Sequence, residues 1–336
     1  MRYAVWNNKG GVGKTFITFV MAAEYASAHP DKKVVAIDMC PQANVSEILL
    51  GGNGKGADTL SSLLAKNPRQ TIGGYFDQRI TQPHAKTGTE INYLVDVFSF
   101  NDKAPKNVYL VAWDPSLELQ AQAINQIAAQ SLPADAWKNS WVLDLVEAIT
   151  AQHPSAVFFI DCNPSFSALT ELALVAADRL IIPCTADGSS ARAIDNVGQL
   201  LYGVNVPPSY ATANFEAKAK NYGMSLPYIH LVPLNRSTQY DKKASRAFGA
   251  MYEEIKNRIA TLQTKIPKRF SLPTNLGSAF LDIPDAHSVS VVASHLGLPL
   301  GDIRVHRYNV HGTPTQVNEE PLDRYKTALK ELAALL

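Results

Sequence analysis

A glycine-rich loop near the beginning of the chain combines the residue types that bind phosphate groups. It reads Lys9-Gly10-Gly11-Val12-Gly13-Lys14-Thr15, and Phe16 then opens a pattern of helical period. Glycines allow the backbone N–H groups of such a loop to point inward, and the N-terminus of the following helix contributes a favourable dipole. The loop therefore predicts a polyphosphate site, in which Lys14 neutralises the terminal phosphates and the hydroxyl of Thr15 binds Mg²⁺.

Such a loop needs a strand before it and a helix after it, and the sequence repeats both kinds of element. Short, nearly continuous apolar runs occupy residues 3–6, 34–37, 108–112, 156–160, 180–183 and 228–234. Continuous rather than alternating runs are typical of strands buried on both faces of a parallel sheet. Helical periodicity covers residues 15–27, 116–129, 136–150, 167–177, 190–202 and 241–261. The alternation predicts an α/β fold with a doubly wound, mostly parallel β-sheet flanked by helices.

The chain is predicted to form a single domain over residues 1–336. Residues 51–106 contain the least regular, glycine- and proline-containing stretches and are interpreted as an insertion at one edge, whereas residues 236–311 form a basic C-terminal part. Residues 298–317 are expected to be irregular. A last helix over residues 322–335 has apolar residues at three- and four-residue spacings, and we expect this stripe to dock on the sheet.

Composition excludes several classes of protein. The 336 residues are 46% hydrophobic, with 31 basic and 30 acidic residues, so the chain is neither disordered nor uniformly basic. Three cysteines cannot form a disulfide framework, and no apolar stretch approaches the ~18 residues that cross a bilayer. Because the first residues lack the apolar core of a signal peptide, we expect a cytoplasmic protein.

The loop departs from the common G-x-x-x-x-G-K-[ST] pattern, because Asn8 stands at its first position and Lys9 follows. In this respect the chain resembles the deviant Walker A ATPases of the ParA/MinD family, a class of P-loop NTPases whose loop reads K-G-G-x-G-K-[ST]. The resemblance implies ATP and Mg²⁺ as cofactors and an ATP-sandwich homodimer. It also implies that Lys9 of each chain reaches across the dimer to the phosphates bound by the other.

The resemblance extends to several further segments. Asp38-Met39-Cys40-Pro41-Gln42-Ala43-Asn44 is similar to the family's D-x-D-P-Q-x-N motif, and the strand ending in Asp161 is similar to its Walker B strand. By resemblance, Asp161 holds Mg²⁺ through water and Asn235 reads the adenine edge. Pro284 and Asp285 correspond to the family's loop that closes over the base.

One position of the second motif differs from the family. Cys40 stands where the family has the aspartate that orients the attacking water. A thiol with an ordinary pKa near about 8.5 is a poor substitute for a carboxylate. We therefore expect weak, partner-stimulated ATP hydrolysis and a long-lived ATP dimer. Asp38 lies two residues earlier, and in a strand this spacing puts its side chain on the same side as Cys40, so it could assist through a water.

The resemblance further implies that the dimer binds DNA without sequence preference through basic residues of the C-terminal part. Residues 236–269 contain nine basic residues against three acidic ones, although the whole chain carries a net charge of only +1. Phosphate contacts of this kind give salt-dependent affinity and suit a nucleoid-associated protein. The candidate DNA-binding residues are Lys242, Lys243, Arg246, Lys256, Arg258, Lys265, Lys268 and Arg269. A solvated helix face explains the same charges without DNA.

The sequence supports one main functional hypothesis and two alternatives. The main one is a ParA-like ATPase that segregates or positions a plasmid, a chromosome region or a protein cargo, with a ParB-like or other stimulating partner. The first alternative is a nearly non-hydrolysing, ATP-gated partner-binding module. The second is a MinD-like membrane-associated positioning ATPase, although no stable membrane association is expected from the C-terminal helix.

Overall fold

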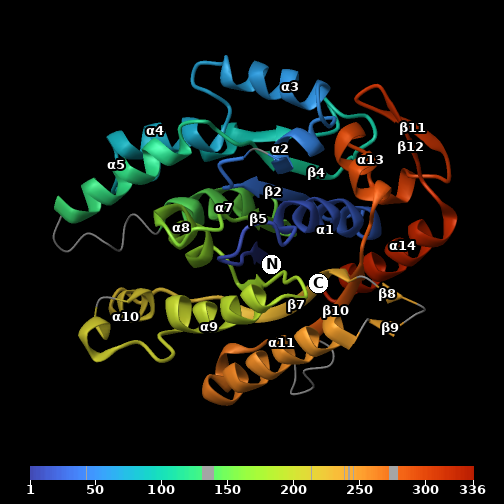
Figure 1. Cartoon of the computed structure of the whole chain (residues 1–336). Helices are drawn as coiled ribbons and strands as arrows, with labels where there is room; N and C mark the ends of the chain where they lie inside the picture. The colour runs from blue at the N-terminus through green and yellow to red at the C-terminus, as the bar shows by residue number, and fades with distance from the viewer. Residues whose placement is uncertain are drawn as a thin grey trace.

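A large β-sheet runs through the molecule (Figure 1). The computed structural model describes the chain apart from residues 43, 131–139, 213, 238, 241–242, 245 and 272–278. Within the described residues the sheet has eight strands in the order β10-β7-β6-β1-β5-β2-β4-β3. In chain order they are β1 (Arg2–Val5), β2 (Val34–Asp38), β3 (Leu94–Asp96), β4 (Val108–Val111), β5 (Val157–Asp161), β6 (Arg179–Ile181), β7 (Tyr228–Ser237) and β10 (Phe280–Pro284).

The sheet confirms the predicted doubly wound, mostly parallel topology. Neighbouring strands are parallel except for β3, which runs antiparallel to β4 at one edge. The six strands that the apolar runs predict are present as β1, β2, β4, β5, β6 and β7. β1 lies between β5 and β6, where the path of the chain across the sheet reverses. In open α/β sheets the crevice at such a switch point, beyond the carboxyl ends of the strands, is where ligands bind.

Helices cover both faces of the sheet (Figure 1). Those present in the described residues are α1 (Lys14–Ala28), α2 (Asn44–Leu49), α3 (Lys55–Leu64), α4 (Ile72–Thr81), α5 (Leu117–Gln130), α7 (Trp141–Gln152), α8 (Ala168–Val175), α9 (Gly188–Tyr202), α10 (Phe215–Asn221), α11 (Arg246–Lys265), α13 (Ser288–Leu296) and α14 (Glu319–Ala334). The predicted helices correspond to α1, α5, α7, α8, α9, α11 and α14. The first residues expected in α7, and residues 241, 242 and 245 expected in α11, lie outside the described residues. The expectation of helix at Lys243–Ala244 is wrong, because these residues pair as the strand β9.

Each central strand sends alternate side chains into two separate cores. In β1 and the residue after it, Tyr3 and Val5 belong to one core, and Ala4 and Trp6 belong to the other. The first core includes side chains of α1, α2, α3, α13 and α14, whereas the second includes side chains of α4, α5, α7, α8, α9 and α11. Burial on both faces explains why the strands are continuous apolar runs.

Residues 51–106 are more regular than the sequence indicates, because they contain α3, α4 and β3. Thr71 caps α4 by accepting a hydrogen bond from the Gly74 N–H at 3.1 Å. Gly73 and Gly74 lie inside this helix, where a larger residue would not fit. A Cβ at Gly73 would lie 2.2 Å from Cγ of Asp114, and a Cβ at Gly74 would lie 2.0 Å from the Arg69 carbonyl oxygen. These glycines allow close packing and do not interrupt the helix.

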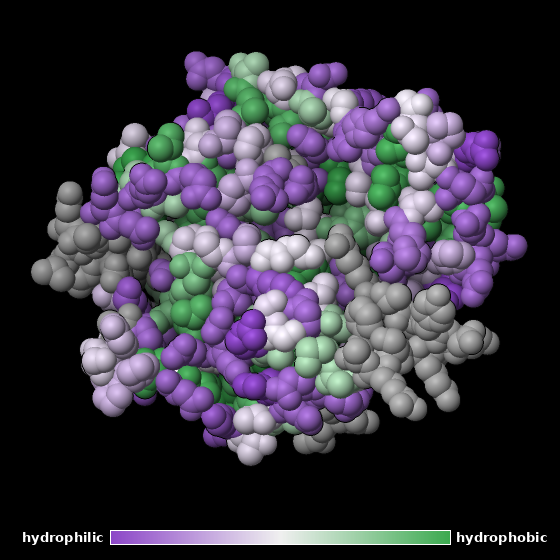
Figure 2. Space-filling model, viewed as in Figure 1, coloured by the Kyte–Doolittle hydropathy of each residue, from purple (hydrophilic) through white to green (hydrophobic). Residues whose placement is uncertain are grey.

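The C-terminal part is also more ordered than the sequence indicates. A hairpin of β11 (Arg307–Val310) and β12 (Thr313–Gln316) lies within the segment expected to be irregular, and a short hairpin joins β8 (Gln239–Tyr240) to β9 (Lys243–Ala244). The apolar stripe of α14 is buried through Leu322, Tyr325, Leu329 and Leu332, which confirms that it docks on the domain. Across the described ranges, no helix is long and apolar enough to cross a membrane. The face seen in Figure 2 shows hydrophobic residues in scattered groups among hydrophilic ones.

Candidate nucleotide site

Strand register brings the chemistry of three segments to one edge of the sheet. Val5, the last residue of β1, pairs with Asp161, the last residue of β5, and Asp38 of β2 pairs with Asp161 from the other side. The glycine loop follows β1 and leads directly into α1. The loop, the end of β2 and the end of β5 therefore meet at the switch point of the sheet.

At Gly13 the loop has a backbone conformation and a close contact that favour glycine. Gly13 has φ 86° at the N-cap of α1, and its carbonyl accepts the first helical hydrogen bond, from the Ile17 N–H at 2.9 Å. A Cβ at Gly13 would lie 2.0 Å from Nδ2 of Asn235, which donates to the Val12 carbonyl at 3.1 Å. The loop and the end of β7 therefore pack in direct contact.

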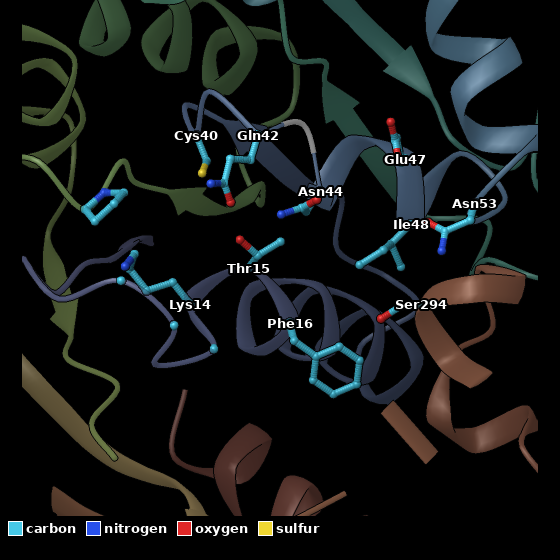
Figure 3. A pocket seen from close by; sticks show the side chains of 14 residues that line it. Lys14, Thr15, Phe16, Cys40, Gln42, Asn44, Glu47, Ile48, Asn53 and Ser294 are labelled. Atoms are coloured by element: carbon cyan, nitrogen blue, oxygen red, sulfur yellow. The ribbon is translucent and has the colours of Figure 1, made fainter. Parts of the chain in front are cut away.

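A cavity of about 450 Å³ opens above the loop (Figure 3). Its walls come from the loop, the segment after β2, the start of α2 and the first turns of α1. They are Gly10, Gly11, Gly13, Lys14, Thr15, Phe16, Cys40, Gln42, Asn44, Glu47, Ile48, Asn53, Pro164 and Ser294. A second cavity of about 280 Å³ shares Gly13, Phe16, Asn53 and Ser294 with the first. The two cavities form one elongated site.

Lys14 is held at the end of this site that the glycine loop forms. Its side chain is largely buried, and Nζ donates to the Lys9 carbonyl oxygen at 2.8 Å. Burial lowers the pKa of Lys14, and the nearby Asp161 partly opposes this effect. A buried ammonium at the base of a glycine loop is suited to neutralise a phosphate.

Thr15 and Asp161 form the pair that fits a magnesium ion. The Thr15 hydroxyl donates to Oδ2 of Asp161 at 2.8 Å, and Thr18 Oγ1 lies 3.5 Å from Oδ1. Burial raises the pKa of Asp161 to about 8, and the neighbouring Asp38 adds to the shift. A hydroxyl and a carboxylate are hard oxygen donors of the kind that Mg²⁺ prefers. A cation here would offset the cost of burying the Asp161 charge.

Cys40 lines the cavity, but Asp38 does not. Burial raises the pKa of Cys40 to about 12, with further contributions from Asp161 and Asp38, so the thiol is neutral at physiological pH. Asp38 is fully buried and accepts hydrogen bonds from the Cys40 N–H at 3.1 Å and from the N–H and hydroxyl of Ser46 at 3.0 and 2.8 Å. The expected help of Asp38 through a water stays a prediction, and its carboxylate is engaged with Ser46 and the Cys40 N–H where β2 ends.

Lys9 is paired within its own chain. Its Nζ forms an ion pair with Asp187 and donates to Oγ1 of Thr185 at 2.9 Å and to Oγ of Ser190 at 3.3 Å. Partial burial alone would raise the pKa of Asp187, but hydrogen bonds from Lys9, Thr185 and Ser189 hold it well below its usual value. The sequence does not indicate this partner, because Asp187 lies far away in the chain and in no recognised motif.

The far end of the site confirms the proximity of two residues suggested by resemblance. Asn235 and Asp285 line the smaller cavity, whereas Pro284, the last residue of β10, is not among its walls. Tyr325 of α14 also lines this cavity, and its ring lies 6.3 Å from that of Phe16. Sequence reasoning missed Asn53, Ser294 and Tyr325. Their apolar or glycine-rich surroundings carry no local signal for a site.

The candidate DNA-binding residues do not form one free basic face. Lys256 pairs with Glu253 at 3.0 Å, and Arg258 pairs with Glu254 at 2.7 Å and with Asp195 at 2.5 Å. Lys265 lies at the end of α11, and its Nζ donates to Oδ1 of Asn205 at 3.2 Å. Lys268 and Arg269 lie in the 3₁₀ helix Pro267–Arg269.

Three of the candidates lie wholly or partly outside the described residues. Lys242 lies outside the described residues. Lys243 belongs to β9 and Arg246 begins α11, but their side chains are not described.

Sequence comparison places this site in a known family. The profile of a family described as an AAA domain matches residues 2–207, which is more than half of the chain. The chain belongs to this family. A relative in Myxococcus xanthus, "Chromosome partitioning protein ParA", is 28% identical over 203 residues, which cover 60% of this chain and 56% of the relative. The match thus spans little more than half the length of that curated relative.

Solved structures share the fold of this AAA domain protein. Apo McdA from Cyanothece has a TM-score of 0.61 at 14% identity, with 98% of each chain covered. The septum site-determining protein MinD from Pyrococcus horikoshii, complexed with Mg-ADP, has a TM-score of 0.52 at 15% identity, with 99% of this chain and 93% of the other covered. These likenesses show a shared fold, and the family match places residues 2–207 in an AAA domain.

Proposed function

We propose that the protein is a Mg²⁺-dependent ATPase that segregates or positions a plasmid, a chromosome region or a protein cargo. The observation that carries the proposal is the elongated site, with Lys14 and the Thr15–Asp161 pair at one end and Asn235 and Asp285 at the other. A nucleoside triphosphate fits this division, with its phosphates over the loop and its base in the smaller cavity. The Mg-ADP named for the MinD neighbour supports the same class of ligand.

In the proposed hydrolysis, the residues of the site bind the nucleotide and stabilise its charge. The N–H groups of the loop and the ammonium of Lys14 would hold the phosphates, and Thr15 and, through water, Asp161 would hold Mg²⁺. When bound, the ion neutralises charge on the phosphate oxygens. Phosphoryl transfer depends mainly on such positioning and charge stabilisation, so the site can support turnover despite the neutral thiol of Cys40.

ATP would also join two copies of the chain in the proposed homodimer. Lys9 is the residue proposed to contact the phosphates bound by the other copy. It would have to leave Asp187, Thr185 and Ser190 to do so. The ATP dimer would bind DNA without sequence preference, which implies a cytoplasmic, nucleoid-associated protein, and a ParB-like or other partner would stimulate hydrolysis.

A nearly non-hydrolysing, ATP-gated binding module is the second candidate function. It is favoured by the neutral Cys40 at the cavity wall and by the engagement of Asp38 with Ser46. Single-turnover hydrolysis with and without DNA separates the two candidates. A MinD-like membrane role is less favoured because the apolar stripe of α14 is buried, and liposome flotation with ATP tests it.

The main proposal is tested by three measurements on purified protein. A fluorescent ATP analogue with Mg²⁺ should bind tightly. Phosphate release with and without DNA should show slow turnover, and sedimentation should show a dimer in ATP but not in ADP. Lys14→Ala is the background control for binding and turnover. Equal signals from wild type and Lys14→Ala would overturn the proposal.

A further inference from the structure

The site contains no carboxylate placed to orient a water at the phosphate end, as far as the described cavity walls extend. Glu47 carries the only carboxylate among these walls, and Figure 3 shows it pointing away from Lys14 and Thr15. Asp38 is enclosed by its bonds to Ser46 and the Cys40 N–H. A polar side chain other than a carboxylate is therefore a candidate to meet the attacking water.

Gln42 has the required position. It is exposed and lines the cavity, and Figure 3 shows its side chain extending from the loop after β2 into the cavity, toward the side where Thr15 lies. Its backbone N–H partly opposes the rise in the pKa of the Cys40 thiol. Gln42 thus belongs to the same short loop as the position from which the family's carboxylate would act.

We propose that the Gln42 carboxamide orients the water that attacks the γ-phosphate, an inference that rests on the proposed ATPase function. A carboxamide can accept a hydrogen bond from the water through Oε1 and donate one to a phosphate oxygen through Nε2. A glutamine orients the attacking water in other phosphoryl-transfer enzymes. Gln42 therefore compensates for the carboxylate that Cys40 lacks.

The chemical step leaves Gln42 unchanged. The water oxygen forms a bond to the γ-phosphorus, and the bond from that phosphorus to the β–γ bridging oxygen breaks. The electrons of the broken bond remain on ADP, and the water protons pass to inorganic phosphate and solvent. Gln42 gains and loses no proton, so its contribution is orientation and not base catalysis.

Asn44 offers a matched control in the same motif. It also lines the cavity and carries a carboxamide, but its side chain is one methylene shorter and it begins α2. If the cavity merely required any carboxamide, Gln42 and Asn44 would be equivalent. The inference requires them to differ.

The test measures turnover and ATP affinity separately. Gln42→Ala should lower kcat by about 10- to 100-fold and change the dissociation constant of Mg·ATP by less than about threefold. Asn44→Ala should lower kcat less than Gln42→Ala does, because its shorter side chain is not required to orient the water. In a Cys40→Asp background, Gln42→Ala should lose most of its effect, because a carboxylate then orients the water. Purely structural damage would not be rescued in this way.

The outcomes separate failure of the inference from failure of the proposed function. The role of Gln42 is overturned if Gln42→Ala keeps the kcat of wild type, or if Asn44→Ala lowers kcat as much as Gln42→Ala does. Either result leaves the ATPase proposal intact. Turnover of wild type no greater than that of Lys14→Ala removes both. A loss of kcat in Gln42→Ala that Cys40→Asp does not rescue also overturns the inference.

Discussion

At the scale of single residues, the Cys40 thiol is a neutral group at the cavity wall. Its pKa, raised by burial to about 12, keeps it neutral over the whole physiological range. A neutral thiol is a weak hydrogen-bond partner, so it neither orients a water strongly nor takes up a proton. If the site binds ATP as proposed, this thiol contributes little to its cleavage.

Restoring a carboxylate at this position should accelerate hydrolysis. We expect Cys40→Asp to raise kcat by about 10- to 100-fold, because the new group lies at the cavity wall where a water can be oriented. Steady-state phosphate release with Mg·ATP measures the effect. Cys40→Ser keeps a neutral side chain and should leave kcat within about threefold.

The same substitution brings a third carboxylate close to Asp38 and Asp161. Mutual repulsion of buried carboxylates should lower the stability of the ligand-free Cys40→Asp protein. Thermal melts with and without Mg·ATP measure how much of the lost stability is restored by ligand binding. An unchanged or lower kcat in a variant that remains folded would show that hydrolysis does not depend on the missing carboxylate.

At the scale of elements, the junction of the loop and α1 depends on Gly13. Gly13→Ala places a Cβ 2.0 Å from Nδ2 of Asn235 at a φ of 86°, so either the loop or the end of β7 must move. We expect a loss of ATP affinity and a stability loss of about 1–3 kcal/mol from the strained backbone alone. A nucleotide titration and urea unfolding measure the two effects.

Gly10 provides the control for that prediction. A Cβ at Gly10 would meet no atom within 4 Å, and Gly10 is not among the glycines with positive φ. Gly10→Ala should therefore unfold at nearly the wild-type urea concentration. If both variants lose the same stability, steric contact with Asn235 is not the cause.

The docking of α14 on β7 should depend on pH. Burial lowers the pKa of His230 in β7. Its Nδ1 lies 2.8 Å from Oγ of Ser271, and its Nε2 lies 2.7 Å from the carbonyl oxygen of Leu335, just beyond the end of α14. A His with a depressed folded pKa contributes stability that is complete above its unfolded pKa of about 6.5 and is lost as pH falls through the folded value. Wild type should therefore lose more free energy of unfolding than His230→Asn between pH 7.5 and pH 5.

Urea unfolding of both proteins at several pH values provides the test. Parallel pH profiles for wild type and His230→Asn would mean that other groups account for any acid sensitivity. The variant itself removes contacts at the end of α14, so only the difference in slope, and not the difference in stability at one pH, is informative.

The sequence predicts the central elements but not the peripheral ones, for physical reasons. Strands buried on both faces consist of continuous apolar residues, whereas β10 contains Asp282 and is mostly half-buried. α4 was missed because Gly73 and Gly74 allow close packing inside a helix, which has the same sequence signature as a loop.

The site follows the same division. The glycine loop is contiguous in sequence, so its chemistry can be predicted locally. Asn53, Ser294 and Tyr325 reach the cavities only through packing of segments that lie far apart in the chain. The bonds of Asp38 to Ser46 could not be predicted locally, because Ser46 lies in α2 beyond the end of β2.

At the scale of the whole molecule, net charge is a poor guide to DNA binding because ion pairs remove part of the basic segment. Lys256 and Arg258 are neutralised by Glu253, Glu254 and Asp195. We therefore expect Lys265→Ala with Lys268→Ala to weaken DNA binding by the ATP state and to reduce the salt slope by about 1–2. Filter binding at several salt concentrations measures both.

Lys256→Ala is the matched control on the same helix. Its charge is already paired with Glu253, so its loss should change DNA affinity less than the loss of Lys265 and Lys268. DNA retention that does not depend on ATP or salt in wild type, or an equal loss in Lys256→Ala, would contradict the assignment of these two lysines.

The ion pair between Lys9 and Asp187 has a consequence for how an assembly would discriminate between nucleotides. Because Lys9 already has a counter-ion in its own chain, moving it to a phosphate yields only the difference between the two contacts. With a ligand of little extra negative charge, the contact of Lys9 with the phosphate and its contact with Asp187 would be similar in free energy. One further phosphate would favour the contact with the ligand. The retained pair would thus act as a threshold that ADP fails to cross and ATP crosses, without any change in how tightly either nucleotide binds a single chain.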